Sequence, residues 1–230
     1  MKVQRIRVTF TRGDELKYIT HLDLMRCWER ALRRADVPVA YSEGFTPHAQ
    51  ISLAAPLPVG TTSGGELMDV VLAERLAPAE LAVRASEQLP AGIHIVACEE
   101  VALHLPSVQA AVRFADYHVD VPADDAGAVA GAVEAFLAAA SVPWEHRRDD
   151  EVRSYDIRAL VQDIRVEPAD GPCLRLKMRL RSDNSGAGRP EQVAAALGLA
   201  APLRIHRTGL VLAGASPARE AWRKRGRFAG

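Results

Sequence analysis

The chain has 230 residues, of which 48% are hydrophobic and 25% charged, and its 29 basic and 29 acidic residues give a formal net charge of zero. This composition is ordinary for a soluble globular protein that folds by itself. No apolar run is long enough to cross a membrane, and the first ten residues alternate like a strand, unlike a signal peptide. We therefore expect a cytoplasmic protein without membrane contact.

The sequence carries no familiar cofactor or metal motif. Cys27, Cys98 and Cys173 are odd in number and far apart, which indicates neither a disulfide framework nor a Cys-x-x-Cys metal site. No phosphate-binding loop, dinucleotide fingerprint, nucleophile elbow or zincin helix is present. We expect no metal and no cofactor.

Charge is distributed unevenly along the chain. Residues 61–150 are acidic, whereas residues 1–60 and 151–212 are basic. Residues 213–230 carry five lysines and arginines against the single carboxylate of Glu220. We predict that this basic tail is disordered, and such arms add nonspecific affinity for nucleic acid.

The hydrophobic pattern predicts the order β-α-β-β-α-β twice. In the first half it predicts strands at 3–11, 50–58, 65–73 and 93–102 and helices at 20–36 and 78–89. In the second half it predicts strands at 113–121, 153–166, 173–181 and 203–212 and helices at 124–140 and 189–198. The predicted fold class is α+β, with tandem ferredoxin-like (βαββαβ) units at 1–105 and 111–212 and antiparallel sheets.

The helix at 20–36 is amphipathic and basic. Thr20 can cap its start, and Asp23 can reciprocate. The predicted apolar stripe comprises Leu22, Met25, Trp28, Leu32 and Ala35. The opposite face carries Arg26, Arg30, Arg33 and Arg34. These arginines either follow a phosphate backbone or form an ordinary solvated face.

A second basic surface lies on the strand CLRLKMRLR at 173–181. Its leucines and Met178 point one way, and its cations, Arg175, Lys177, Arg179 and Arg181, point the other. Four like charges repel unless carboxylates or a polyanion cover them, and Asp156 or Asp163 on the preceding strand could supply the carboxylates. Some readers of single-stranded RNA use a basic sheet face in this way.

The loop after the basic helix, YSEGFTPH at 41–48, has the composition of an ordered turn. It contains Gly44, Phe45, Pro47 and His48. If the loop folds back, His48 and Tyr41 converge with His21 and Asp23 at the helix start, as acid, base and orienter for RNA cleavage. Alternatively, His21 packs at the helix start and His48 hydrogen-bonds the loop backbone.

Three motifs of the first third resemble one known family. They are HLDLMR followed by ERALRRA at 21–35, YSEGFTPH at 41–48 and ISLAAPLPVG at 51–60. They are similar to motifs of the radical SAM-linked proteins of unknown function. This resemblance implies association with a cobalamin-binding radical SAM enzyme and, in some bacteria, proximity to an E/G-type ribonuclease. It supplies no reaction.

Three functional hypotheses follow. The first is an accessory module without catalytic activity of its own that works with a radical SAM enzyme and binds RNA or docks the enzyme to it. The second is an RNA-processing or RNA-modifying enzyme that uses His21 and His48. The third is a protein interaction scaffold without RNA.

Overall fold

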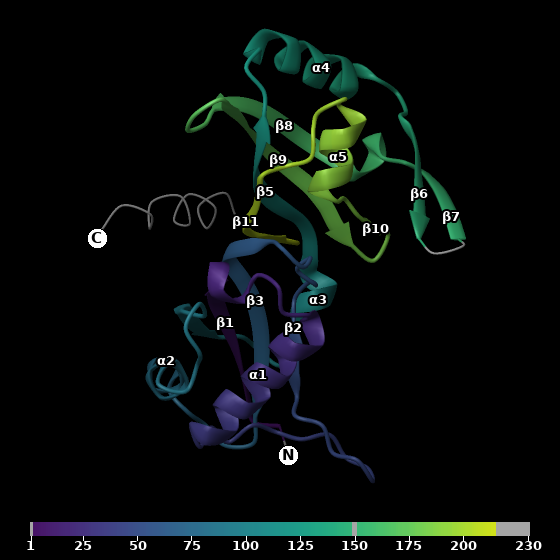
Figure 1. Cartoon of the computed structure of the whole chain (residues 1–230). Coiled ribbons are helices and arrows are strands. Elements are labelled where there is room, and N and C mark those ends of the chain that lie inside the picture. Colours follow the sequence, from purple (N-terminus) through teal and green to yellow (C-terminus); the bar gives the residue numbers. More distant parts are fainter. Residues whose placement is uncertain (1, 149–150, 215–230) are drawn as a thin grey trace.

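The first half of the chain folds as βαββαβ in the computed structural model, which describes residues 2–148 and 151–214 (Figure 1). Its elements are β1 (Gln4–Arg12), the 3-10 helix η1 (Asp14–Leu16), α1 (His21–Arg34), β2 (Ile51–Leu53), β3 (Thr62–Leu72), α2 (Pro78–Ser86) and β4 (Ile95–Glu100). Strands pair in the order β2-β3-β1-β4, and each pair is antiparallel. This order is ferredoxin-like.

The second half repeats this topology with additions. Its elements are α3 (Val108–Ala111), β5 (Val112–Pro122), α4 (Ala126–Ala138), β6 (Pro143–Arg148), β7 (Glu151–Asp156), the 3-10 helix η2 (Arg158–Leu160), β8 (Val161–Pro168), β9 (Cys173–Asp183), β10 (Gly186–Ala187), α5 (Pro190–Ala196) and β11 (Arg204–Leu212). Strands pair in the order β8-β9-β5-β11, again antiparallel. The predicted α+β class with ferredoxin-like topology is confirmed.

Two predicted strands are wrong in extent. The predicted strand at 153–166 is interrupted, because the Asp156 carboxylate accepts hydrogen bonds from Val142 N and Arg158 N and the chain turns there. The part before this turn, β7, pairs with β6 in a separate hairpin, which projects to the right in Figure 1. The strand at 50–58 is only β2, because Pro56 and Pro58 have no N–H to donate.

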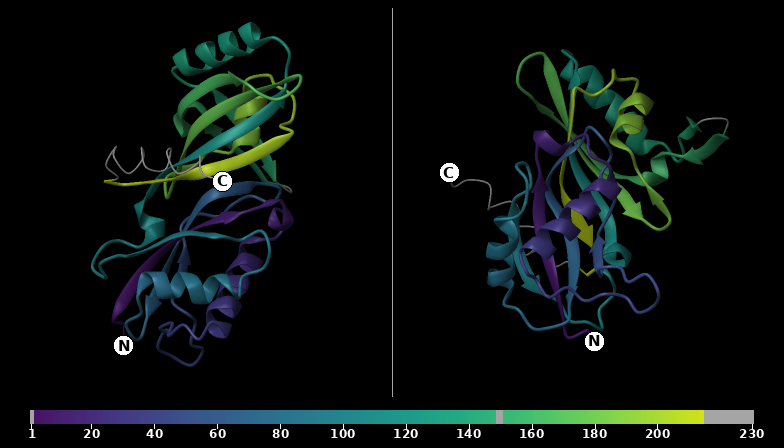
Figure 2. Two further views of the ribbon diagram at one scale, coloured as in Figure 1. Left: turned by 90° about the vertical axis from the view of Figure 1, so that its left-hand side faces the viewer. Right: turned by 60° about the horizontal axis from the view of Figure 1, so that its bottom comes forward.

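The two halves form one continuous sheet, and the shortness of β2 leaves room for the strand that joins them. Because β2 pairs only with residues 68–70 of β3, the start of the same edge of β3 remains open. There β11 pairs with β3 in parallel, with His206 opposite Thr62 and Arg207 opposite Ser63. Figure 2 shows β11, in yellow, crossing between the halves.

A buried ion pair crosses this junction. Arg207 is 1% exposed, and its Nε donates to Glu66 Oε1 at 2.7 Å while Nη2 pairs with Oε2. The guanidinium also donates to the carbonyl oxygens of Ala55 and Pro56 at 3.1 Å. Burial opposes the charged form, yet Glu66 and the hydroxyl of Tyr117 raise the pKa of Arg207. Arg207 is therefore charged, and each nitrogen of its guanidinium donates to an acceptor oxygen.

Each half has its own apolar core. In the first, α1 buries Leu24, Trp28, Ala31 and Leu32, and the Trp28 ring meets Phe10 edge-on at 4.9 Å. The predicted apolar stripe is wrong at Leu22, which is 65% exposed. The second core lies between the sheet and helices α4 and α5, and it also includes Ala54, Ala55 and Leu67 of the first half.

No helix within the described residues is long and apolar enough to cross a membrane. The predicted disordered tail lies outside the described residues beyond Gly214.

Replacing Arg207 by methionine is expected to lower the free energy of unfolding by roughly 3–5 kcal/mol, because Glu66 is left buried without its counter-ion. Urea denaturation measures this loss. The control is Arg165→Met, since the Arg165 side chain is 75% exposed and its removal costs little. Equal losses in the two variants would show that the junction does not depend on the pair.

Candidate functional site

Helix α1 begins at a well-defined cap. Thr20 Oγ1 accepts a hydrogen bond from Asp23 N at 3.2 Å, and the same hydroxyl donates to Asp23 Oδ2 at 2.7 Å. The predicted cap is confirmed. Because the apolar face of α1 is buried against the sheet, all four of its arginines face outward and lie in exposed positions.

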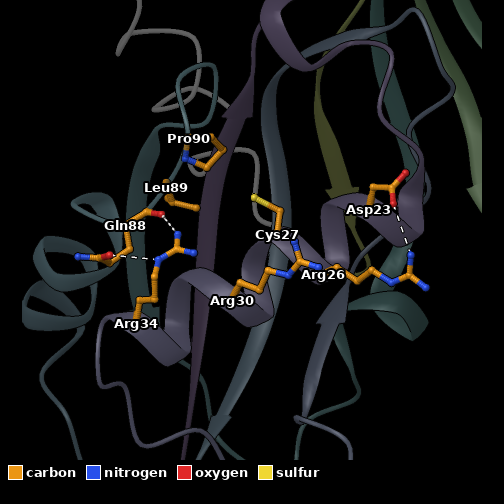
Figure 3. A pocket seen from close by; sticks show the side chains of 8 residues that line it. All are labelled: Asp23, Arg26, Cys27, Arg30, Arg34, Gln88, Leu89 and Pro90. Atoms are coloured by element: carbon orange, nitrogen blue, oxygen red, sulfur yellow. Dashed lines mark hydrogen bonds and ion pairs between the residues drawn. The ribbon is translucent and has the colours of Figure 1, made fainter.

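A shallow groove of about 370 Å³ runs along α1 (Figure 3). It is lined by Asp23, Arg26, Cys27, Arg30, Arg34, Gln88, Leu89 and Pro90. Three of these arginines recur every fourth residue, so they form one row on the helix surface. The facing wall is the connection between α2 and β4. Sequence reasoning missed this wall, because no local pattern brings residues 88–90 to a helix more than fifty residues earlier.

The arginines of the groove differ in how they are held. Arg34 donates to Gln88 Oε1 at 3.2 Å and to Gln88 O at 2.5 Å. Because Arg34 lies in the last turn of α1, its positive charge also interacts favourably with the helix dipole. Arg26 lies 3.6 Å from Asp23 Oδ1. For Arg30, the described part of the chain provides no hydrogen bond or ion pair. Arg30 is therefore the most available cation of the row.

The groove is electropositive and partly apolar. Three guanidinium groups face the single carboxylate of Asp23, and guanidinium groups match phosphate geometry well. Burial raises the pKa of the Cys27 thiol, although Arg34 and Arg30 act in the opposite direction. The thiol is therefore protonated at neutral pH, and the groove keeps its positive charge.

Three of the four cations of β9 are neutralised by carboxylates of neighbouring strands. Leu174, Leu176, Met178 and Leu180 are buried, which confirms the predicted alternation. The cations pair as follows: Arg175 with Asp120 at 2.6 Å, Lys177 with Glu167 at 2.6 Å, Arg179 with Asp116 at 2.7 Å and Arg181 with Ser185 Oγ at 2.8 Å.

Of the two carboxylates proposed for this role, Asp156 is the wrong one, because it accepts backbone hydrogen bonds in the turn before β8. Asp163 lies directly opposite Arg179 on β8, as proposed, and its carboxylate pairs with Arg165. The true partners of β9 come mainly from β5, because β5 lies beside β9 in the sheet. Sequence order alone did not reveal this pairing.

The four candidate catalytic residues lie in two pairs. His21 and Asp23 are on the first turn of α1, whereas Tyr41 and His48 are exposed at the base of the loop that follows its far end. A helix of 14 residues is about 20 Å long. Within residues 2–148 and 151–214, no hydrogen bond or ion pair joins the two pairs. His48 instead donates its N–H to Ser42 Oγ at 2.9 Å.

His21 lies beside the junction ion pair. Burial lowers the pKa of its imidazole, Glu66 acts against this shift, and Arg207 adds to it. Arg12, which is 1% exposed, is the other charged group here, and burial lowers its pKa as well. Its Nη2 donates to the carbonyl oxygens of Lys17, Pro58 and Thr61. These contacts tie the start of α1 to the sheet.

A profile of one protein family matches residues 5–190, and its description is "Uncharacterized protein conserved in bacteria (DUF2344)". The chain belongs to this family. The match covers the arginine groove, the loop at 41–48 and most of the second half, so the DUF2344 region includes both candidate surfaces. No curated protein matches the chain significantly.

Two solved structures are similar to this DUF2344 chain only in outline. One is from "Crystal Structure of a Cbf5-Nop10-Gar1 Complex", with 10% identity, a TM-score of 0.49 and coverage of 91% of this chain but 49% of that chain. The other is from "Crystal structure of putative glycine cleavage system transcriptional repressor", with 10% identity, a TM-score of 0.25 and coverage of 89% and 98%. Similarity this low carries no functional information.

The lowered pKa of His21 predicts how this DUF2344 member responds to acid. The folded state favours the neutral imidazole, so the unfolded chain binds this proton first as the pH falls through about 6.5. The wild type should therefore lose more stability than His21→Gln between about pH 7 and pH 5. Urea midpoints across this range measure the difference, and parallel curves would contradict the assignment.

Proposed function

We propose that this protein is an accessory module that binds RNA along the arginine groove of α1 and works with a cobalamin-binding radical SAM enzyme. In this proposal the module has no catalytic activity of its own. The observation that carries it is the row of Arg26, Arg30 and Arg34 beside an open groove that contains one carboxylate.

The two basic surfaces support the proposal unequally. On β9, Arg175, Lys177 and Arg179 already have carboxylate partners, so a polyanion would have to compete with these partners. On α1, Arg30 and Arg33 are exposed, and Arg30 projects into the groove. Phosphate contacts with such cations release counter-ions and give salt-dependent affinity. The helix is therefore the favoured RNA surface.

The radical SAM partner rests on the motifs at 21–35, 41–48 and 51–60, which resemble those of radical SAM-linked proteins. A radical SAM enzyme needs clustered cysteines for its iron–sulfur cluster, whereas Cys27, Cys98 and Cys173 lie on α1, β4 and β9. Radical chemistry would therefore belong to a partner. Copurification of the two proteins with and without RNA tests this part separately.

Arg30→Ala is expected to weaken binding of single-stranded RNA and to reduce the slope of log Kd against log salt by roughly 0.7 for each phosphate that the variant no longer neutralises. Fluorescence anisotropy across a salt series measures both quantities. Arg75→Ala is the control, because it removes an exposed arginine that pairs with Glu100 of β4 and lies on neither α1 nor β9. Salt-independent binding by the wild type, or equal slopes in Arg30→Ala and the wild type, would refute the RNA proposal.

Arg179→Ala tests whether β9 also contacts RNA. Its charge is already matched by Asp116, so we expect the salt slope of this variant to stay close to that of the wild type. If Arg179→Ala reduced the salt slope as much as Arg30→Ala does, the result would show that β9 also contacts RNA.

A further inference from the structure

The loop at 41–48 is a small hairpin held by its backbone. Ser42 N donates to His48 O at 2.9 Å, and Gln50 N donates to Ala40 O at 2.8 Å. Ala40 N in turn donates to Val71 O on β3 at 2.8 Å. Gly44 adopts a φ of 122°, which favours glycine. Backbone hydrogen bonds thus form the loop, and the side chain at its tip does not need to pack against the protein.

That tip carries Phe45, which is fully exposed to solvent. Burying a phenylalanine side chain would contribute about 1.5–3 kcal/mol, and this chain forgoes that gain. Tyr41 at the loop base is 47% exposed as well. A loop that backbone hydrogen bonds close at its base therefore presents aromatic surface outward, although the fold itself does not require it.

The charge around the loop indicates the kind of partner. The loop follows the C-terminal end of α1, which bears Arg33 and Arg34. In Figure 1 both lie in the lower part of the molecule, with the end of the helix on the left and the tip of the loop on the right. Against these cations the loop has one carboxylate, Glu43. Proteins that bind unpaired nucleotides combine exposed aromatic rings with exposed cations, since bases stack on the rings while the cations contact phosphates along the same strand.

We infer that Phe45 is a stacking platform for an unpaired RNA base, so that the ligand of this module is single-stranded RNA. This inference rests on the proposed RNA-binding function and specifies its substrate class. The arginine row of α1 supplies the charge-dependent affinity, and Phe45 supplies a contribution that does not depend on salt. A duplex, whose bases are already stacked on each other, would engage the arginines alone.

The experiment uses the full chain with fluorescently labelled oligo(A) and with an RNA duplex of equal length. Phe45→Ala should raise the Kd for oligo(A) by on the order of tenfold. The salt slope should stay that of the wild type, because no charge is removed. Affinity for the duplex should not change. The melting temperature should also stay constant, because Phe45 is fully exposed. The control is Leu203→Ala, a 68% exposed apolar residue of the second half.

Two further variants separate stacking from general hydrophobic contact. Phe45→Trp should bind oligo(A) at least as tightly as the wild type, whereas Phe45→Leu should bind as weakly as Phe45→Ala. Wild-type affinity in Phe45→Leu would indicate hydrophobic contact and overturn the inference, as would wild-type affinity in Phe45→Ala.

The two proposals fail in different ways. If the wild type binds oligo(A) with a salt slope that Arg30→Ala reduces, but Phe45→Ala has no effect, only the stacking inference is refuted. If the wild type shows no salt-dependent binding to either RNA, the proposed function is refuted and the stacking inference with it.

Discussion

The buried pair between Arg207 and Glu66 is the interaction on which the architecture depends. It joins the last strand of the second half to β3 of the first, where the two strands pair over only two residues. So short a parallel ladder contributes few backbone hydrogen bonds. The ion pair, with its added hydrogen bonds to Ala55 and Pro56, fixes the register there. Desolvation offsets much of the attraction in such a buried pair, whereas removal of one partner leaves the other as an uncompensated buried charge.

The junction also organises the first half of the molecule. The backbone acceptors of Arg207 lie in the segment after β2. Arg12 donates to carbonyl oxygens of the same region and to that of Lys17, just before α1. The start of α1 is thereby held against the sheet, while Trp28 and its neighbours anchor the middle of the helix. A rigid helix lowers the entropic cost of presenting a row of arginines to a ligand. The groove is thus a consequence of packing as well as of composition.

Local patterns predicted much of the fold and part of the site. The cap at Thr20, the basic face of α1 and the alternation of β9 are encoded in short segments, and each is present in the structure. The residues that contact those segments in the fold are not encoded locally. Asp116 and Asp120 face β9 because of sheet order, and Gln88 faces α1 because of a turn after α2. Such contacts depend on tertiary pairing, which propensity and periodicity do not encode.

The most direct test of the RNA-binding account is crosslinking of the full chain to single-stranded RNA, with the attached peptides identified by mass spectrometry. The account predicts crosslinks on residues 20–36 and 87–92, which line the groove, and on the loop at 41–49. Crosslinks confined to β5 and β9, or to the β6–β7 hairpin, would contradict it.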